Sequence, residues 1–251
     1  MDLSPFIDRP SDAAVMTDFD GTLAAIVDDP ARATPVDGAV AVVHALCSRY
    51  RRMAVISGRP VEFLARFLGD GPLLVGLYGL ERMERGHRTI HPSAAKWIDV
   101  VAAMVERAHA EAPDGVRIEH KGLTFTLHVR EAPQHEQWMA SFSESVSSAT
   151  GLTRHAGRKS IELKPPVAVD KGSVVAEIAE GLSAACFVGD DHGDLAAFDA
   201  LDRLHADCGA AVLRVAVKSS EAPPELVERA DVLVDGPEGS VDFLKSLCPT
   251  D

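Results

Sequence analysis

Residues 14–22 read Ala-Val-Met-Thr-Asp-Phe-Asp-Gly-Thr, a short apolar run that ends in two acidic residues. Side chains two apart on a strand point to the same side, so Asp18 and Asp20 should face one space. Two carboxylates held together are costly unless a cation lies between them. Gly21 permits a sharp turn after them. An isolated Asp-x-Asp pair is usually a solvated acidic turn, but the complete Asp-Phe-Asp-Gly-Thr after a buried run is far more specific.

The segments around this stretch alternate between short buried strands and amphipathic helices. Continuous apolar runs interleaved with helices are typical of a parallel sheet that is covered on both faces. We therefore predict an α/β core. The expected strands are 14–17, 53–56, 73–77, 185–188, 211–217 and 232–234, and the expected helices are 36–49, 61–68, 171–179, 195–201 and 241–247.

The pattern changes between residues 91 and 166. A helix is expected over 94–112, then strands at 116–119 and 123–129, a helix at 133–149, and strands at 152–155 and 160–163. We predict an inserted α+β domain over 91–166, within a core formed by 1–90 and 167–251. Residues 115–165 carry seven Lys or Arg and five Asp or Glu, whereas the whole chain has a charge of −13. This basic character is either chance or marks a domain that holds an anionic substrate over an acidic, metal-binding core.

Two further clusters lie at the end of a predicted strand and at the start of a predicted helix. Ser57-Gly58-Arg59 follows the strand at 53–56, where a hydroxyl and backbone N–H groups can bind phosphate oxygens, although most Ser-Gly pairs are turns. Asp170-Lys171-Gly172 begins the helix at 171–179. Taken alone, this tripeptide is best interpreted as an N-cap followed by a surface lysine.

A fourth cluster, Gly189-Asp190-Asp191-His192-Gly193-Asp194, holds three carboxylates at the end of a buried strand. Carboxylates have no stabilising reason to gather there without a cation, and oxygen-only ligands favour Mg²⁺. Asp194 alternatively serves as the N-cap of the helix at 195–201, but that role would not explain Asp190.

Composition excludes several other classes of protein. The 251 residues include 25 Lys and Arg against 38 Asp and Glu, which disfavours general binding to nucleic acids or anionic membranes. The apolar runs are shorter than the ~20 residues of a membrane helix, and the N-terminus has no secretory pattern. The four cysteines are scattered, unlike a zinc site or a disulfide framework. We expect a monomeric, cytoplasmic protein with no membrane or nucleic-acid partner.

The order of the four clusters resembles the haloacid dehalogenase superfamily of phosphohydrolases, and the insertion resembles that superfamily's C2-type cap. The resemblance implies a Rossmann-like core with a parallel sheet and a cap domain that sets substrate specificity. Within the superfamily, residues 119–136 and 157–165 look like two stretches of the trehalose-6-phosphate phosphatases. Three positions depart from that family's usual pattern: Tyr78 replaces His, Val129 replaces Tyr, and Leu195 replaces an acidic residue.

The resemblance implies a Mg²⁺-dependent phosphatase that releases trehalose and phosphate from trehalose 6-phosphate, the last step of trehalose biosynthesis. Asp18 is expected to attack phosphorus, and Asp20 to protonate the leaving sugar oxygen and then deprotonate water. Ser57 would bind a phosphate oxygen and Lys171 would offset the negative charge. The expected Mg²⁺ ligands are the Asp18 carboxylate, the Asp20 carbonyl and Asp190, with Asp191 and Asp194 either ligating directly or bonding to the ligands. The residues expected to contact substrate are Gly21, Thr22, Gly58, Arg59, Glu119, Lys121, His128, Arg130, Glu162 and Lys164.

Two other functions stay open. One is a phosphatase of the same fold acting on a related sugar, glycoside or aminocyclitol phosphate, which the departures at Tyr78, Val129 and Leu195 favour. The other is a non-catalytic sugar-phosphate sensor, against which the presence of Asp18, Asp20, Lys171 and Asp190 argues. Without the resemblance, Lys121 would be interpreted as a solvated turn residue and His128 as a buried strand residue.

Overall fold

The computed structural model describes residues 2–27, 29–157, 159–219 and 222–248. The chain divides into two compact units, Met1–Thr89 with Val169–Asp251, and Ile90–Ala168. We call the first the core unit and the second the inserted unit. The boundaries predicted from the sequence, 91 and 166, fall one and two residues inside those of the inserted unit.

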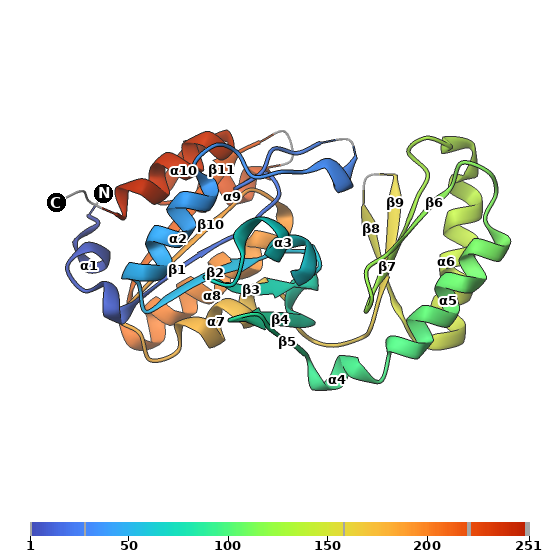
Figure 1. Ribbon diagram of the computed structural model, residues 1–251, viewed down its shortest axis with the longest axis horizontal. Helices are drawn as coiled ribbons and strands as arrows, with labels where there is room; N and C mark the ends of the chain where they lie inside the picture. The colour runs from blue at the N-terminus through green and yellow to red at the C-terminus, as the bar shows by residue number, and fades with distance from the viewer. Residues whose placement is uncertain (1, 28, 158, 220–221, 249–251) are drawn as a thin grey trace. The chain divides into compact units, whose positions relative to one another are not determined.

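An eight-stranded sheet runs through the core unit in the order β12-β11-β10-β1-β2-β3-β4-β5 (Figure 1). β1 (Ala13–Thr17) pairs in parallel with β2 on one side and with β10 on the other. Such a switch in strand order opens a crevice at the carboxyl ends of the strands, where ligands of α/β proteins bind. The other strands are β2 (Arg52–Ile56), β3 (Leu73–Gly76), β4 (Glu81–Glu84), β5 (His87–Ile90), β10 (Ala184–Gly189), β11 (Ala211–Lys218) and β12 (Val232–Asp235).

Helices cover both faces of this sheet, which is why every residue of β1 is buried. Ala13 and Val15 of β1 pack with the helices of one face, and Ala14 and Met16 pack with those of the other. The first face carries α1 (Ser4–Ile7), α2 (Ala39–Arg49), α3 (Val61–Leu68) and α10 (Gly236–Ser246). The second face carries α7 (Lys171–Ala179), α8 (Leu195–Cys208) and α9 (Pro224–Arg229).

The inserted unit is a four-stranded antiparallel sheet in the order β6-β7-β9-β8, with helices on one face (Figure 1). Phe125 and Leu127 of β7 pack against Val105 of α5 and Phe142 of α6. Because side chains alternate along a strand, Thr126 and His128 point to the face opposite to α5 and α6, which we call the open face of this sheet. The elements are α4 (Pro92–Ala95), α5 (Ile98–Glu111), β6 (Arg117–His120), β7 (Phe125–His128), α6 (Glu136–Thr150), β8 (Thr153–Gly157) and β9 (Ser160–Lys164).

The α/β core with a mostly parallel sheet and an α+β insertion is confirmed, and four details of the prediction are wrong. β4, which runs antiparallel to β3, and β5 beside it were not predicted, because residues 81–90 are largely polar. The helix expected over 94–112 is interrupted at 96–97 between α4 and α5. The helix expected from 36 begins at Ala39, since Gly38 has a φ of +84°. The helix expected over 195–201 continues to Cys208.

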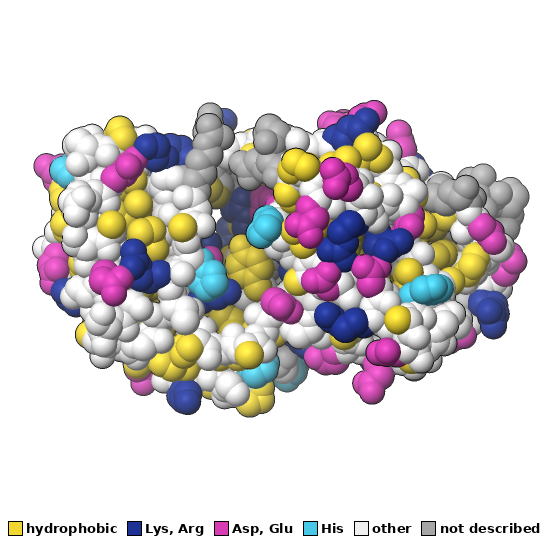
Figure 2. All heavy atoms as spheres, turned by 180° about the vertical axis from the view of Figure 1, so that it is seen from behind, with side chains coloured by type: hydrophobic (Ala, Val, Ile, Leu, Met, Phe, Trp, Pro, Cys, Tyr) yellow, Lys and Arg dark blue, Asp and Glu magenta, His cyan; other side chains and the backbone are white. Residues whose placement is uncertain are grey.

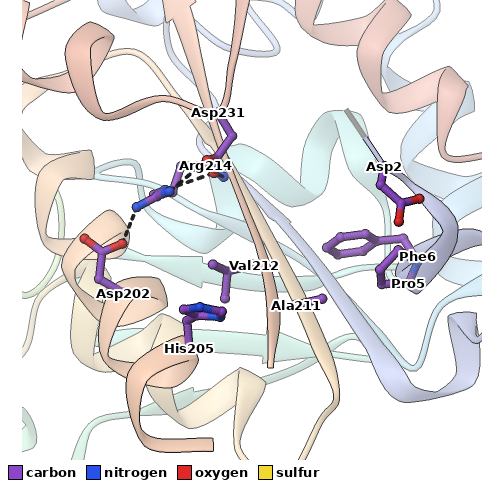
Figure 3. Close-up of a pocket in the computed structure, with 9 residues that line it drawn as sticks. All are labelled: Asp2, Pro5, Phe6, Asp202, His205, Ala211, Val212, Arg214 and Asp231. Carbon is purple, nitrogen blue, oxygen red and sulfur yellow. Dashed lines mark hydrogen bonds and ion pairs between the residues drawn. The ribbon is translucent and has the colours of Figure 1, made fainter. Parts of the chain in front are cut away.

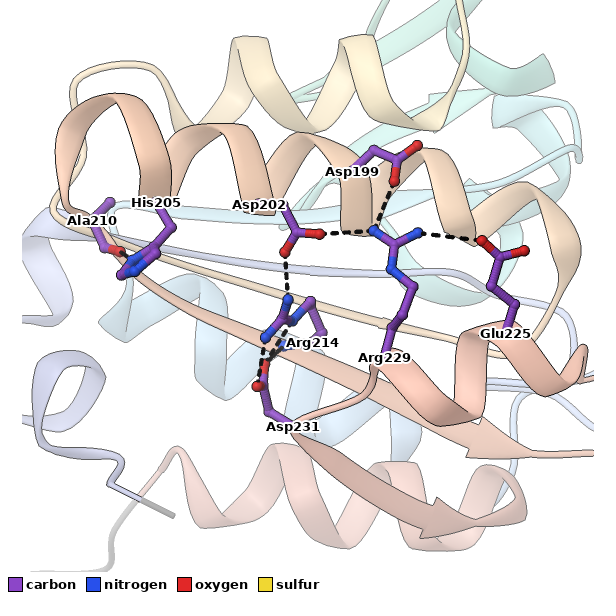
Figure 4. Close-up of polar contacts among 8 residues, drawn as sticks. All are labelled: Asp199, Asp202, His205, Ala210, Arg214, Glu225, Arg229 and Asp231. Carbon is purple, nitrogen blue, oxygen red and sulfur yellow. Dashed lines mark hydrogen bonds and ion pairs between the residues drawn. The ribbon is translucent and has the colours of Figure 1, made fainter.

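A network of ion pairs joins α8, β11 and α9 at the surface of the core unit (Figure 4). Arg214 pairs with Asp202 and Asp231, and Arg229 pairs with Asp199 and Asp202. Positive and negative side chains lie beside one another on the face seen in Figure 2 rather than in separate patches. Among the described helices, none has both the length and the apolar character needed to span a membrane.

Candidate active site

Two predicted catalytic residues, Asp18 and Ser57, and the predicted metal ligand Asp190 follow directly after neighbouring parallel strands. Asp18 comes after β1 and its N–H donates to the Val188 carbonyl of β10, 2.9 Å away. Ser57 comes after β2 and its N–H donates to the Val75 carbonyl of β3, also at 2.9 Å. Asp190 follows β10. Since the carboxyl ends of parallel strands meet at one edge, the sheet brings these three side chains to the same edge.

Lys171 connects the acidic residues of this edge. Its Nζ lies 2.9 Å from Asp18 Oδ2, 2.6 Å from Asp194 Oδ1 and 3.6 Å from Asp191 Oδ1. The lysine side chain is only 1% exposed, so its interpretation as a surface residue is wrong. Burial disfavours the ammonium, but Asp18, Asp194 and Asp191 together hold the pKa of Lys171 well above its usual value. Lys171 therefore stays charged beside Asp18.

Asp194 shapes the loop that carries Asp190. Its Oδ2 accepts the backbone N–H groups of Asp190 at 2.8 Å and of Asp191 at 2.9 Å. A Cβ at Gly189 would lie 2.3 Å from this carboxylate, so the close approach requires glycine. Burial raises the pKa of Asp194 to about 6. Asp194 stands at the N-cap position of α8 but its side chain makes no capping bond, so that alternative does not account for the carboxylate. Asp170 does cap α7, by accepting the Ser173 N–H.

Asp190 lies among hydroxyl donors and other carboxylates. Thr22 Oγ1 donates to its Oδ1 at 3.3 Å, and Ser219 Oγ donates to its Oδ2 at 2.9 Å. Burial, followed by the nearby Asp194, raises the pKa of Asp190 to about 7. Burial likewise raises the pKa of Asp18 well above its usual value, against the opposing effect of Lys171. Burial therefore disfavours the simultaneous ionisation of Asp18 and Asp190 unless a cation besides Lys171 is present.

The donor set fits a hard divalent cation. Carboxylate oxygens of Asp18, Asp190 and Asp194 lie within 4.8 Å of one another and all three residues are buried. Both oxygens of Asp194 already accept hydrogen bonds from Lys171 and the loop, which leaves Asp18 and Asp190 as the better ligands. Gly21 has a φ of +72°, and a Cβ there would lie 2.0 Å from Asp190 Oδ2. Asp191, the remaining acidic residue, contacts Lys171; although burial favours its neutral form, the ammonium keeps its pKa low.

Asp20 and Arg59 form a bidentate ion pair. Arg59 Nε donates to Asp20 Oδ2 and Arg59 Nη2 donates to Asp20 Oδ1, both at 2.7 Å. The Asp20 side chain is thus directed to Arg59, and only its backbone carbonyl could serve a metal as predicted. The Tyr78 ring packs so closely against Gly58 that a Cβ on this residue would lie 2.6 Å from the ring, so the contact requires glycine. Tyr78, at the position where the resembling family often has His, therefore lies against the Ser57–Arg59 loop.

The inserted unit gathers most of its predicted substrate-binding residues on the open face of its sheet. His128 Nε2 lies 2.9 Å from Glu119 Oε2. Glu162 Oε1 accepts hydrogen bonds from Thr124 Oγ1 at 2.8 Å and from Lys121 Nζ at 3.3 Å. The register places Glu119 opposite Thr126 and Glu162 opposite Thr126 on the other side, so the face is polar across three strands. Lys164 lies two residues beyond Glu162 on β9, and Arg130 is exposed just after β7.

Two contacts to Asp190 were not predicted as such. Thr22 was expected to bind substrate, but its hydroxyl donates to Asp190. Ser219 was not singled out at all, although it directly follows β11, the strand beside β10. A hydroxyl at the carboxyl end of a neighbouring strand is the signal that could have identified it.

A separate cavity of about 540 Å³ opens near the amino-terminal end of β11 (Figure 3). Phe6, Val212 and His205 line it, together with Arg214, whose guanidinium is engaged by Asp202 and Asp231. None of the predicted site residues lines this cavity, which lies at the edge of the sheet opposite to Asp18 and Asp190.

This fold, with an acidic site at the switch in strand order, is similar to the fold of solved haloacid dehalogenase-like hydrolases. A haloacid dehalogenase-like hydrolase from Bacteroides thetaiotaomicron superimposes with a TM-score of 0.64 at 14% identity, over 94% of this chain and 99% of that one. A trehalose-6-phosphate phosphatase related protein superimposes with a TM-score of 0.79 at 24% identity, over 93% and 96% of the two chains.

The chain belongs to the trehalose-phosphatase family, whose sequence pattern matches residues 16–227. The trehalose-phosphate phosphatase of Mycobacterium marinum is 34% identical over 200 residues, which cover 75% of this chain and 51% of that protein. An uncharacterized glycosyl hydrolase of Mycobacterium tuberculosis is 34% identical over 206 residues, covering 75% of this chain and 15% of that protein. The chain thus spans about half the length, or less, of these relatives.

Proposed function

We propose that this chain hydrolyses trehalose 6-phosphate to trehalose and phosphate through a phosphorylated Asp18, with Mg²⁺ as cofactor. The observation that carries the proposal is the buried Asp18 carboxylate, 2.9 Å from the Lys171 ammonium and within 4.8 Å of the carboxylates of Asp190 and Asp194. Membership of the trehalose-phosphatase family and the polar open face of the inserted unit support the choice of substrate.

The first step forms a bond between an Asp18 oxygen and phosphorus while the bond from phosphorus to the sugar oxygen breaks. Asp20 binds a proton from solvent on one oxygen when the substrate enters, and gives that proton to the departing sugar oxygen, which leaves as the hydroxyl of trehalose. Lys171 stays charged beside Asp18 and stabilises the negative charge that the phosphoryl group brings. Ser57 donates a hydrogen bond to a phosphoryl oxygen.

The second step returns Asp18 to its starting state. Asp20, now a carboxylate, takes a proton from the water that attacks phosphorus, and the bond from Asp18 to phosphorus breaks. Asp18 and Asp190 would hold Mg²⁺, which when bound neutralises phosphate charge and orients the ester for in-line displacement. Thr22 and Ser219 orient the Asp190 carboxylate for this task.

The inserted unit is proposed to select the sugar. Carboxylates and cationic side chains hydrogen-bond well to sugar hydroxyls. Glu119, His128, Glu162 and Lys121 are joined in two hydrogen-bonded pairs on one sheet face, which fixes their directions before substrate arrives. Arg130 and Lys164 extend this set.

The test is phosphate release from trehalose 6-phosphate, with and without Mg²⁺, beside glucose 6-phosphate, sucrose 6-phosphate and p-nitrophenyl phosphate. We expect a Mg²⁺-dependent preference for trehalose 6-phosphate, and its loss in Asp18→Asn. Asp242→Asn, which changes a carboxylate whose side chain is 75% exposed, is the matched control and should retain activity. An active Asp18→Asn protein would refute the mechanism.

A second candidate is a phosphatase for a related sugar, glycoside or aminocyclitol phosphate. The Tyr78 ring against Gly58 favours it, because this departure from the family's usual residue lies beside the predicted phosphate loop. Efficient turnover of another ester, with poor turnover of trehalose 6-phosphate, would select it. Binding without any Mg²⁺-dependent phosphate release would instead select the sensor. The monomeric state and the cytoplasmic location stay predictions.

A further inference from the structure

Arg59 is fixed by the core unit independently of Asp20. Its Nη1 donates to the Pro30 carbonyl at 2.6 Å, and its own backbone N–H donates to Ser57 Oγ at 3.2 Å. Its guanidinium carbon lies 4.6 Å from the centre of the Phe63 ring, a cation–π distance. The arginine side chain is only 12% exposed. Two contacts to the guanidinium, from the Pro30 carbonyl and the Phe63 ring, therefore set where it lies, and the bond to Ser57 holds the backbone that carries it.

The same aromatic support reaches the nucleophile segment. Phe19 lies between Asp18 and Asp20 in the sequence and points into the core, where its ring meets Phe63 edge-on at 5.8 Å. Phe63 is on α3, directly after the Ser57–Arg59 loop. The ring under Arg59 and the residue that precedes Asp20 are thus packed together. The distance between the guanidinium and the Asp20 backbone is therefore set by the packing of Phe19 against Phe63 and of Phe63 against Arg59.

Asp20, in contrast, has a side chain that is 37% exposed, and Arg59 is the only partner that the hydrogen bonds among the described residues give its carboxylate. A short acidic side chain at a solvated loop samples several rotamers unless a partner holds it. We propose that Arg59 is a positioning residue for Asp20, holding its carboxylate within reach of the leaving oxygen and of the attacking water. This inference rests on the proposed function and gives Arg59 a different role from the substrate contact predicted from the sequence.

The bidentate geometry explains why arginine suits this role. The planar guanidinium offers two parallel N–H groups to one carboxylate, so one hydrogen bond can open while the other holds the group in place. The freed Asp20 oxygen then carries the proton that goes to the sugar oxygen, and later the proton taken from water. A lysine at this position would supply charge but only a point contact.

The test is a double-mutant cycle on kcat. Arg59→Gln should lower kcat for trehalose 6-phosphate by about tenfold to hundredfold, within the range of general acid–base effects, with KM changed less than about twofold. In an Asp20→Asn background the same change should alter kcat less than about twofold, because the residue that Arg59 positions no longer transfers a proton. Arg59→Lys should recover part of the loss. Arg229→Gln, which removes another ion-paired arginine away from the site, is the control and should leave kcat unchanged.

The kinetic results distinguish positioning of Asp20 from direct binding of the phosphate by Arg59. A raised KM with unchanged kcat, or equal losses in both backgrounds, would show that Arg59 binds the phosphate itself and would overturn the proposal. If trehalose 6-phosphate is not hydrolysed, the proposed substrate fails and the cycle is run on whichever ester of the panel is turned over. The ¹⁵N spectrum tests the contact without turnover: the Arg59 Nε–H signal should be protected from exchange in the wild type and lose protection in Asp20→Ala, which has no acceptor for it. An unprotected signal in the wild type would refute the ion pair.

Discussion

Replacing Lys171 by methionine tests the balance of charge in the site. The ammonium lies 2.6 Å from Asp194 Oδ1 and 2.9 Å from Asp18 Oδ2. With an effective dielectric constant of about 20, each contact corresponds to about 6 kcal/mol of Coulomb attraction. Removing the lysine also removes the cost of burying it, several kcal/mol, so the net loss of folding free energy should be about 3–5 kcal/mol at neutral pH.

The loss should depend on pH in a definite direction. A carboxyl group whose pKa is higher in the folded than in the unfolded protein binds a proton on folding, so its destabilising effect is complete above the folded pKa and disappears below the unfolded one. Burial already raises the pKa of Asp18 and of Asp194, and without the ammonium both rise further. The deficit of Lys171→Met should therefore be largest at about pH 8 and shrink towards about pH 5.

Urea unfolding in the presence of a chelator, followed by circular dichroism, measures this deficit. Tryptophan fluorescence is the wrong probe, because Trp97 and Trp138 both lie in the inserted unit. Lys245→Met is the matched control, since that lysine is 56% exposed and pairs with an exposed Asp242. A deficit of equal size at both pH values would mean that lost packing, and not unpaired charge, causes it.

Three further predictions concern the metal site and the surface. Gly21→Ala should bind Mg²⁺ more weakly in calorimetry, because the new Cβ would lie 2.0 Å from Asp190 Oδ2. Gly209→Ala is the control: its φ is +67° and the space around it is open, so it should lose only about 1–2 kcal/mol of folding free energy. Equal Mg²⁺ affinities in the two variants would contradict this geometry. The Mg²⁺ affinity of the wild type should rise by up to about tenfold per pH unit until about pH 7 and then level off. The reason is that Asp190, with a pKa of about 7, must lose its proton before it can bind the ion. A constant affinity over this pH range would exclude such competition. Arg229→Gln should cost about 1 kcal/mol, less at about 1 M salt, because its ion pairs are partly exposed; a loss unaffected by salt would point to packing instead.

The buried part of the core unit is readable from sequence because burial leaves a simple pattern. β1, β2 and β10 are mostly apolar on both faces, and a polar site residue directly follows each of them. The polar edge strands β4 and β5 carry no such pattern, so they were missed. Their position depends on Glu81, whose buried carboxylate accepts hydrogen bonds from the Val61 N–H and from Arg88, and a contact of this kind has no local sequence signal.

The candidate site, too, could be predicted from the sequence only in part. Asp18, Ser57 and Asp190 were identified because each follows a strand, and the topology of the sheet then brings them to one edge. The partners of Asp20 and Asp190 were not, because Arg59 is 39 residues from Asp20 and Ser219 is 29 residues from Asp190 in the chain. Which distant residue a side chain contacts depends on how the folded chain packs, as the Phe63 ring that supports Arg59 illustrates.

The pairing of β1 with β10 has a consequence for synthesis of the chain. Ala13 lies opposite Ala184, so the strand that precedes Asp18 lacks one of its two neighbours until residues 184–189 have been translated. The inserted unit is one continuous segment, Ile90–Ala168, and its sheet pairs only strands within that segment. We expect it to fold first on the nascent chain, while β1 waits as an open sheet edge that is prone to aggregation. Asp18 and Asp190 then come together only in the closing step of folding.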